Sequence, residues 1–115
     1  MKLSEIASRI AIDSRKLTEY ALDFDNPLGR HKALVFEKRL GFSKSNAASL
    51  QQQIEALAPK TEAVLQRTDQ YGRHYRVDIQ ATGTAGQQAP VRTGWLVPPG
   101  SDTAHLVTCY VLRKA

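Results

Sequence analysis

Three consecutive basic residues stand where a helix is expected to begin. Arg30, His31 and Lys32 precede an apolar-periodic segment that ends at Leu40. A helix N-terminus presents free backbone N–H groups and the positive end of the helix dipole, so it favours an anion such as phosphate. The simpler alternative is that these charges are solvated in the first exposed turn. Both interpretations stay open from this segment alone.

A second set of cations falls on polar positions of two expected strands. Residues 74–81 alternate between apolar and polar side chains, and His74 and Arg76 occupy the polar positions. Arg92 has the equivalent position in residues 91–97. Cations facing each other across an antiparallel pair could converge on one phosphate. A solvated sheet face is the alternative, and it is slightly favoured for His74.

Two further residues have both a structural and a functional interpretation. Thr108 interrupts the apolar run 106–112, and a hydroxyl in a buried strand needs a hydrogen-bond partner. It either contacts a ligand or is a satisfied strand residue. Trp95 is expected in the core, with a stacking surface for a nucleobase as the less favoured alternative.

Histidine, lysine, arginine and threonine are sufficient for RNA cleavage without a metal. A base removes the ribose 2′-OH proton, the oxygen attacks the adjacent phosphorus, an acid protonates the departing 5′-oxygen, and cations stabilise the phosphorane. The sequence has no GxGxxG, P-loop or HExxH motif and no Cys/His cluster. It therefore predicts no metal site and no cofactor.

The composition is that of one small basic domain. The chain has 115 residues, 42% of them hydrophobic, and a formal net charge of +5. This charge favours a polyanionic partner or an acidic protein. The single cysteine, Cys109, excludes an internal disulfide, and charges at Lys2, Glu5 and Arg9 interrupt any signal-peptide core. No apolar stretch has the length of a membrane span.

Periodicity divides the chain into a helical part, 1–58, and a sheet part, 60–114, of a single domain, 1–115. The fold class predicted is α+β, with the N-terminal helices packed on one face of a four-stranded antiparallel sheet. A turn-rich loop is expected over residues 23–29, and the last strand is expected to be central because it is apolar on both faces. The expected helices are 3–12, 15–22, 30–40 and 46–57, and the expected strands are 62–68, 74–81, 91–97 and 105–112.

Several segments together resemble an uncharacterised family of small bacterial domains, found alone or at the C-termini of polymorphic toxins. The resemblance spans about residues 14–112. It is carried by KLTEYAL at 16–22, NPLGRHKA at 26–33 with Phe36, LGF at 40–42, Tyr71-Gly72 with Tyr75 and Val77, VRTGW at 91–95 and LVTCY at 106–110.

The resemblance implies a fold like that of the barnase, EndoU and RelE ribonuclease toxins, cleavage of RNA, and a cognate immunity protein or antitoxin as partner. It also implies action in the bacterial cytoplasm, with delivery as part of a secreted effector as one route. The polar positions that match the family pattern are Lys16, Lys32, Arg92, Thr93 and Thr108. The three histidines match no fixed position, and Cys109 and Val111 depart from the pattern.

The leading hypothesis is a metal-independent endoribonuclease toxin domain. Lys32 and Arg92 would bind phosphate, Thr108 would position phosphate or ribose, and His31 or His74 would act as acid or base. The alternatives are a non-catalytic RNA- or protein-binding module that uses the same basic face, and an enzyme for a small molecule. The residues expected to bind RNA outside the catalytic set are Lys16, Arg30, Arg76 and Thr93.

Overall fold

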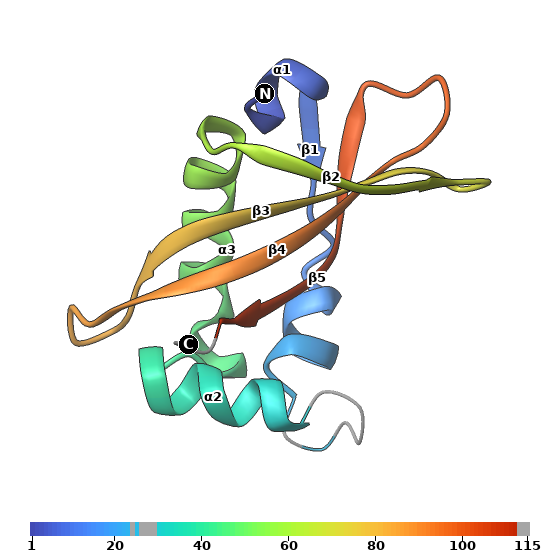
Figure 1. The fold of residues 1–115 in the computed structure, drawn as a ribbon. Coiled ribbons are helices and arrows are strands. Elements are labelled where there is room, and N and C mark those ends of the chain that lie inside the picture. The colour runs from blue at the N-terminus through green and yellow to red at the C-terminus, as the bar shows by residue number, and fades with distance from the viewer. Residues whose placement is uncertain (24, 26–29, 113–115) are drawn as a thin grey trace.

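One five-stranded sheet, with helices packed against one of its faces, forms the domain (Figure 1). The computed structural model describes residues 1–23, 25 and 30–112. The strand order is β1-β5-β4-β3-β2. In chain order the elements are α1 (Leu3–Ile6), β1 (Arg9–Ala11), the π-helix η1 (Lys16–Ala21), α2 (Arg30–Leu40), the 3-10 turn η2 (Lys44–Asn46), α3 (Ala47–Leu57), the 3-10 turn η3 (Ala58–Lys60), β2 (Ala63–Asp69), β3 (Gly72–Thr82), β4 (Gln88–Val97) and β5 (Thr103–Val111).

The two longer helices confirm the periodicity of the sequence. α2 buries Ala33, Phe36 and Leu40 at helical spacing. It ends where Gly41 adopts φ +76°, a left-handed conformation that favours glycine, and the Gly41 N–H donates to the Glu37 carbonyl. α3 packs against β3, and α2 packs against β4 and β5. The loop expected over residues 23–29 lies mostly outside the described residues.

The expected helix over residues 3–12 is wrong beyond its first turn. α1 ends at Ile6, and residues 9–11 instead form β1, which pairs in parallel with β5 from Arg9 opposite Thr103 to Ala11 opposite His105. A four-residue helix gains little from its own hydrogen bonds, whereas the edge of β5 offers unpaired backbone groups. The sheet therefore has five strands rather than four, and one pair is parallel.

The second expected helix exists in a wider form. Residues 16–21 make a π-helix, and the Leu22 N–H donates to the Leu17 carbonyl five residues earlier, at 2.8 Å. Leu17 and Leu22 are both fully buried. The wider turn allows both leucines to reach the core, a preference that helical periodicity does not reveal.

The last four strands lie side by side in chain order and are antiparallel, as expected. The expectation that the last strand, β5, is the central one is wrong. β4 is the central strand, and β5 lies between β4 and the short β1. A bulge interrupts the β4–β5 register, with Gly94 opposite Thr108 and Trp95 opposite Leu106, so Val107 is the extra residue. This bulge explains why residues 106–112 appear apolar on both faces.

A hydrogen-bonded threonine lies beneath the middle of the sheet. Thr93 has no exposed surface, and its Oγ1 donates to the Val77 carbonyl at 2.7 Å and accepts from Trp95 Nε1 at 2.7 Å. Trp95 is 1% exposed, which confirms the expected core position and leaves no surface on which a base could stack. These bonds satisfy the indole and fix β3 against β4.

We expect Thr93→Val to lower the free energy of unfolding by about 1–3 kcal/mol, because it leaves the buried Trp95 N–H and Val77 carbonyl without this partner. Urea unfolding measures the change. Thr68→Val, on an exposed position of β2, is the matched control and should shift stability by less than about 0.5 kcal/mol. Equal losses in the two variants would show that the buried bonds contribute nothing specific.

Candidate functional site

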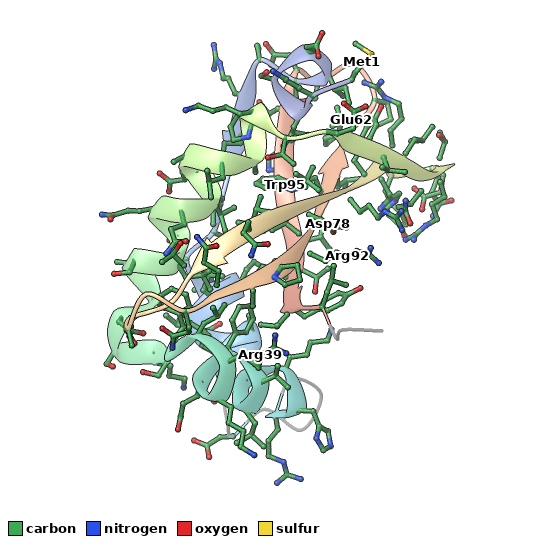
Figure 2. All side chains as sticks on the ribbon, turned by 60° about the vertical axis from the view of Figure 1, so that its left-hand side comes forward. Met1, Arg39, Glu62, Asp78, Arg92 and Trp95 are labelled. Carbon is green, nitrogen blue, oxygen red and sulfur yellow. The ribbon has the colours of Figure 1, made fainter. Side chains whose placement is uncertain are left out.

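The sheet face opposite the helices arranges polar side chains in rows across the strands. Arg76 on β3, Gly94 on β4 and Thr108 on β5 are register partners and form one row. Asp78, Arg92 and Tyr110 form the next row. Figure 2 shows Asp78 and Arg92 on the side of the sheet away from α3. Successive strand residues alternate between faces, so burying Tyr75, Val77 and Ile79 places Arg76 and Asp78 here.

These rows border a groove of about 350 Å³ on the open face. Its lining is mostly polar or aromatic and includes three arginines. The lining residues are Gln66, Arg67, His74, Tyr75, Arg76, Arg92, Gly94, Trp95, Val107, Thr108 and Tyr110.

Gly94 forms the floor of the groove because it has no side chain. Its φ is not in the left-handed region, so backbone conformation does not require glycine here. A Cβ at this position would instead lie 2.9 Å from Cγ2 of Thr108. The missing side chain keeps open the space between Arg76 and Thr108, in the centre of the groove.

Arg92 is held in place by two neighbours. Its Nε and Nη2 donate to the two carboxylate oxygens of Asp78 at 2.9 and 3.0 Å, a forked pair of the kind arginine also makes with phosphate. The hydrogen bonds to Asp78, with a further one to the Tyr110 hydroxyl, raise the pKa of Arg92 above its ordinary value. With 27% of its side chain exposed, Arg92 is a fixed cation accessible from the groove.

His74 lies at the other end of the groove and is oriented by a carboxylate. Its Nε2 is 2.9 Å from Oδ2 of Asp69, and 16% of the histidine side chain is exposed. Burial alone would raise the pKa of Asp69, but hydrogen bonds from His74 and the Tyr71 N–H outweigh it and hold that pKa below its usual value. If Nε2 carries the proton shared with Asp69, Nδ1 keeps a lone pair that can accept a proton.

A second hollow, of about 260 Å³, lies on the other side of Tyr110. His31, Lys32 and Val35 of α2 face Tyr110 and Val111 of β5 across it. The Lys32 ammonium lies 4.9 Å from the centroid of the Tyr110 ring. Because β1 covers only residues 103–105 of β5, α2 reaches Tyr110 around the rest of that edge.

The structure therefore groups most of the expected site residues around Tyr110. His74, Arg76, Arg92 and Thr108 line the groove, and His31 and Lys32 line the adjoining hollow.

Three residues expected to bind RNA lie elsewhere. Thr93 is buried on the helix side of the sheet, so its expected contact with RNA is corrected. Lys16 lines a different hollow, with Asp13, Arg15 and Glu19. Arg30 is exposed at the first residue of α2 and lines neither the groove nor the hollow beside Tyr110.

Four residues of the site were not found by sequence reasoning. They are Asp69, Asp78, Gly94 and Tyr110. Asp69 orients His74, Asp78 pairs with Arg92, Gly94 leaves space beside Thr108, and Tyr110 faces Lys32. Alternation places Asp78 on the polar face, so its pairing with Arg92 needed only the strand register. The bulge at Val107 conceals the side on which Thr108 and Tyr110 lie.

Within residues 1–23, 25 and 30–112, no group of three or more His, Cys, Asp or Glu side chains is placed to hold a metal ion. In the same part of the chain, none of the helices combines the length and the apolar character needed to cross a membrane.

Residues 2–113 match the family described as a domain of unknown function, DUF6883, and the chain belongs to that family. Among solved structures, the fold is similar to a chain of a contact-dependent growth inhibition toxin–immunity protein complex from Klebsiella pneumoniae 342. The TM-score is 0.70 at 15% sequence identity, covering 90% of this chain and 93% of the other. At this identity the likeness establishes the fold. No curated protein matches the sequence.

Proposed function

We propose that this domain is the toxic part of an interbacterial or toxin–antitoxin system and acts as a metal-independent endoribonuclease. The observation that carries the proposal is the groove over Gly94. There Arg76, Arg92 and Thr108 surround a space suited to a phosphate, and His74, which pairs with Asp69, lines the same groove. The fold shared with a protein from a toxin–immunity complex supports the toxic role.

The phosphate of the cleaved linkage would lie above Gly94. While Nε and Nη2 of Arg92 donate to Asp78, its Nη1 and the second hydrogen of Nη2 remain for a phosphate. Arg76 lines the same space from β3. Two cations beside the phosphate, one of them held in place by Asp78, stabilise the additional negative charge of the phosphorane more than that of the ground state. The Thr108 hydroxyl can donate to a phosphate oxygen or accept from the ribose.

His74 is the acid–base residue best placed for the reaction. It takes the proton from the ribose 2′-OH, and the O2′–P bond forms as the P–O5′ bond breaks. Water donates a proton to O5′, which completes the departure of the leaving strand and leaves a 2′,3′-cyclic phosphate on the other; the hydroxide formed takes the proton back from His74. Asp69 stabilises the imidazolium formed in the first step. Lys32 acts beyond Tyr110, on the neighbouring part of the RNA.

An immunity protein or antitoxin is the proposed protein partner. The chain has a net charge of +5, and the groove contributes three arginines to it. Acidic side chains that cover the groove would both match this charge and exclude RNA. The proposed site of action is the bacterial cytoplasm, where RNA is abundant.

Incubating the purified domain with defined RNA in EDTA tests the proposed activity. We expect discrete fragments ending in 2′,3′-cyclic phosphate, and growth arrest when the domain is expressed in bacteria without its partner. RNA that is bound but stays intact would favour the alternative, a non-catalytic binding module using the same face. Its affinity should then fall steeply with salt, as phosphate contacts require.

A further inference from the structure

We infer that the hollow between α2 and β5 is a second subsite, which holds the nucleobase beside the phosphate bound over Gly94. This inference rests on the proposed ribonuclease function and specifies its substrate class, RNA that is unpaired at the cleavage site. The residues that carry it are Lys32 and Val35 on α2 and Tyr110 on β5.

The two subsites adjoin each other on opposite sides of one residue. Tyr110 lines both the groove and the hollow. It lies opposite Arg92 in the register of β4 and β5, on the groove side, and its ring faces Lys32 on the other. A nucleic acid whose phosphate contacts Arg92 therefore has its adjoining nucleotide next to the Tyr110 ring.

The chemistry of the hollow fits a base with a phosphate at its margin. The half-buried Val35 and the Tyr110 ring provide apolar surface, and the ammonium of Lys32 lies above that ring. A stacked base makes a stronger contact with an aromatic ring than an exposed ammonium does. Stacking would release the three donors of Lys32 for the flanking phosphate, and His31 is exposed at the same margin.

The location of the hollow restricts the form of the RNA. It lies between a helix and a strand, and Tyr110 separates it from the groove. A base that enters it has left any base pair and any stack within a duplex, since proteins reach such bases only in single strands, loops or flipped-out positions. Because a paired base cannot enter the hollow, we expect the domain not to distinguish fully paired duplexes of different base sequence.

An abasic scan tests the inference with the intact domain. Short RNA oligonucleotides with one cleavage site carry a single abasic nucleotide at successive positions, and kcat/KM is measured for each. For the wild type we expect one position next to the cut to cost about tenfold or more, the range of one base–aromatic stack. Annealing the intact oligonucleotide to its complement should slow cleavage by at least a similar factor.

Two variants locate the effect. Val35→Glu should reduce the cost of the abasic position to about twofold or less, because a carboxylate in the hollow excludes the base that the abasic nucleotide lacks. Lys32→Gln should lower kcat/KM on every oligonucleotide of the series but keep that cost, because it removes the contact with the flanking phosphate and leaves the Tyr110 ring in place. Leu34→Glu, at the exposed residue just before Val35 in α2, is the control and should keep the full cost. Because each ratio is taken within one variant, a change in folding or basal rate cancels.

The result separates this inference from the proposed function. Three results would overturn the second subsite alone: equal costs at all abasic positions, an unchanged cost in Val35→Glu, or equal rates on duplex and single strand. If the wild type cleaves nothing, the ribonuclease proposal fails, and Kd values for the same abasic series still decide the subsite. A position-specific loss of affinity that disappears in Val35→Glu supports it, and a uniform series contradicts it.

Discussion

Arg92→Lys is expected to lower kcat/KM for RNA cleavage by about 100-fold or more, the loss typical for a donor that stabilises a transition-state anion. Lysine keeps the charge but cannot make the forked contact that Arg92 makes with Asp78 at 2.9 and 3.0 Å. It would neither hold its position against Asp78 nor present two parallel donors to a phosphate. Steady-state cleavage of a short fluorescent RNA measures the effect.

Arg15→Lys provides the matched control for this substitution. Arg15 makes a similar contact with Asp13, including Nη2 to Oδ2 at 2.7 Å, in a hollow that shares no residue with the groove. We expect cleavage close to the wild-type rate. A similar loss in both variants, or full activity in Arg92→Lys, would contradict the role assigned to Arg92.

His74→Gln is expected to reduce kcat by about 10²–10⁴-fold, the usual contribution of a general acid or base. Glutamine retains hydrogen bonding to Asp69 but cannot exchange a proton near neutral pH. Affinity for a substrate blocked with a 2′-O-methyl group should stay within about twofold, since the arginines that bind phosphate are unchanged.

His105→Gln is the control for the histidine substitution. His105 is exposed on β5 but does not line the groove. An unchanged rate in His105→Gln beside a strongly reduced one in His74→Gln would support the assignment. A loss of RNA affinity in His74→Gln that accounts for the whole effect would instead indicate a binding residue, as in the non-catalytic module.

Regular spacing made much of the fold predictable from the sequence. The pattern of Ala33, Phe36 and Leu40 identified α2, and the alternation over residues 74–81 identified both faces of β3. The alternation over residues 74–81 placed Arg76 on the open face, and the alternation over residues 91–97 placed Arg92 there. Local patterns were sufficient because each of these elements buries one face against a continuous core.

The features that depend on distant partners were not predictable in this way. Residues 9–11 form a strand only because β5 is available beside them, and the spacing of Leu3, Ile6 and Ile10 suits a helix equally well. The burial of Thr93 depends on its bonds to Val77 and Trp95. The role of Tyr110 depends on the bulge in β5 and on the approach of Lys32 from α2.

The parallel pairing of β1 with β5 also has a consequence for the order of folding. The hydrogen bond from Ser8 to Asp102, beside this pair, spans 94 residues, whereas β2 to β5 follow one another through short connections. Contacts between distant residues form slowly because a long loop must close first. We expect the meander of β2 to β5 to assemble before β1 joins it, so amide exchange at residues 9–11 should report the last step of folding and the first step of unfolding.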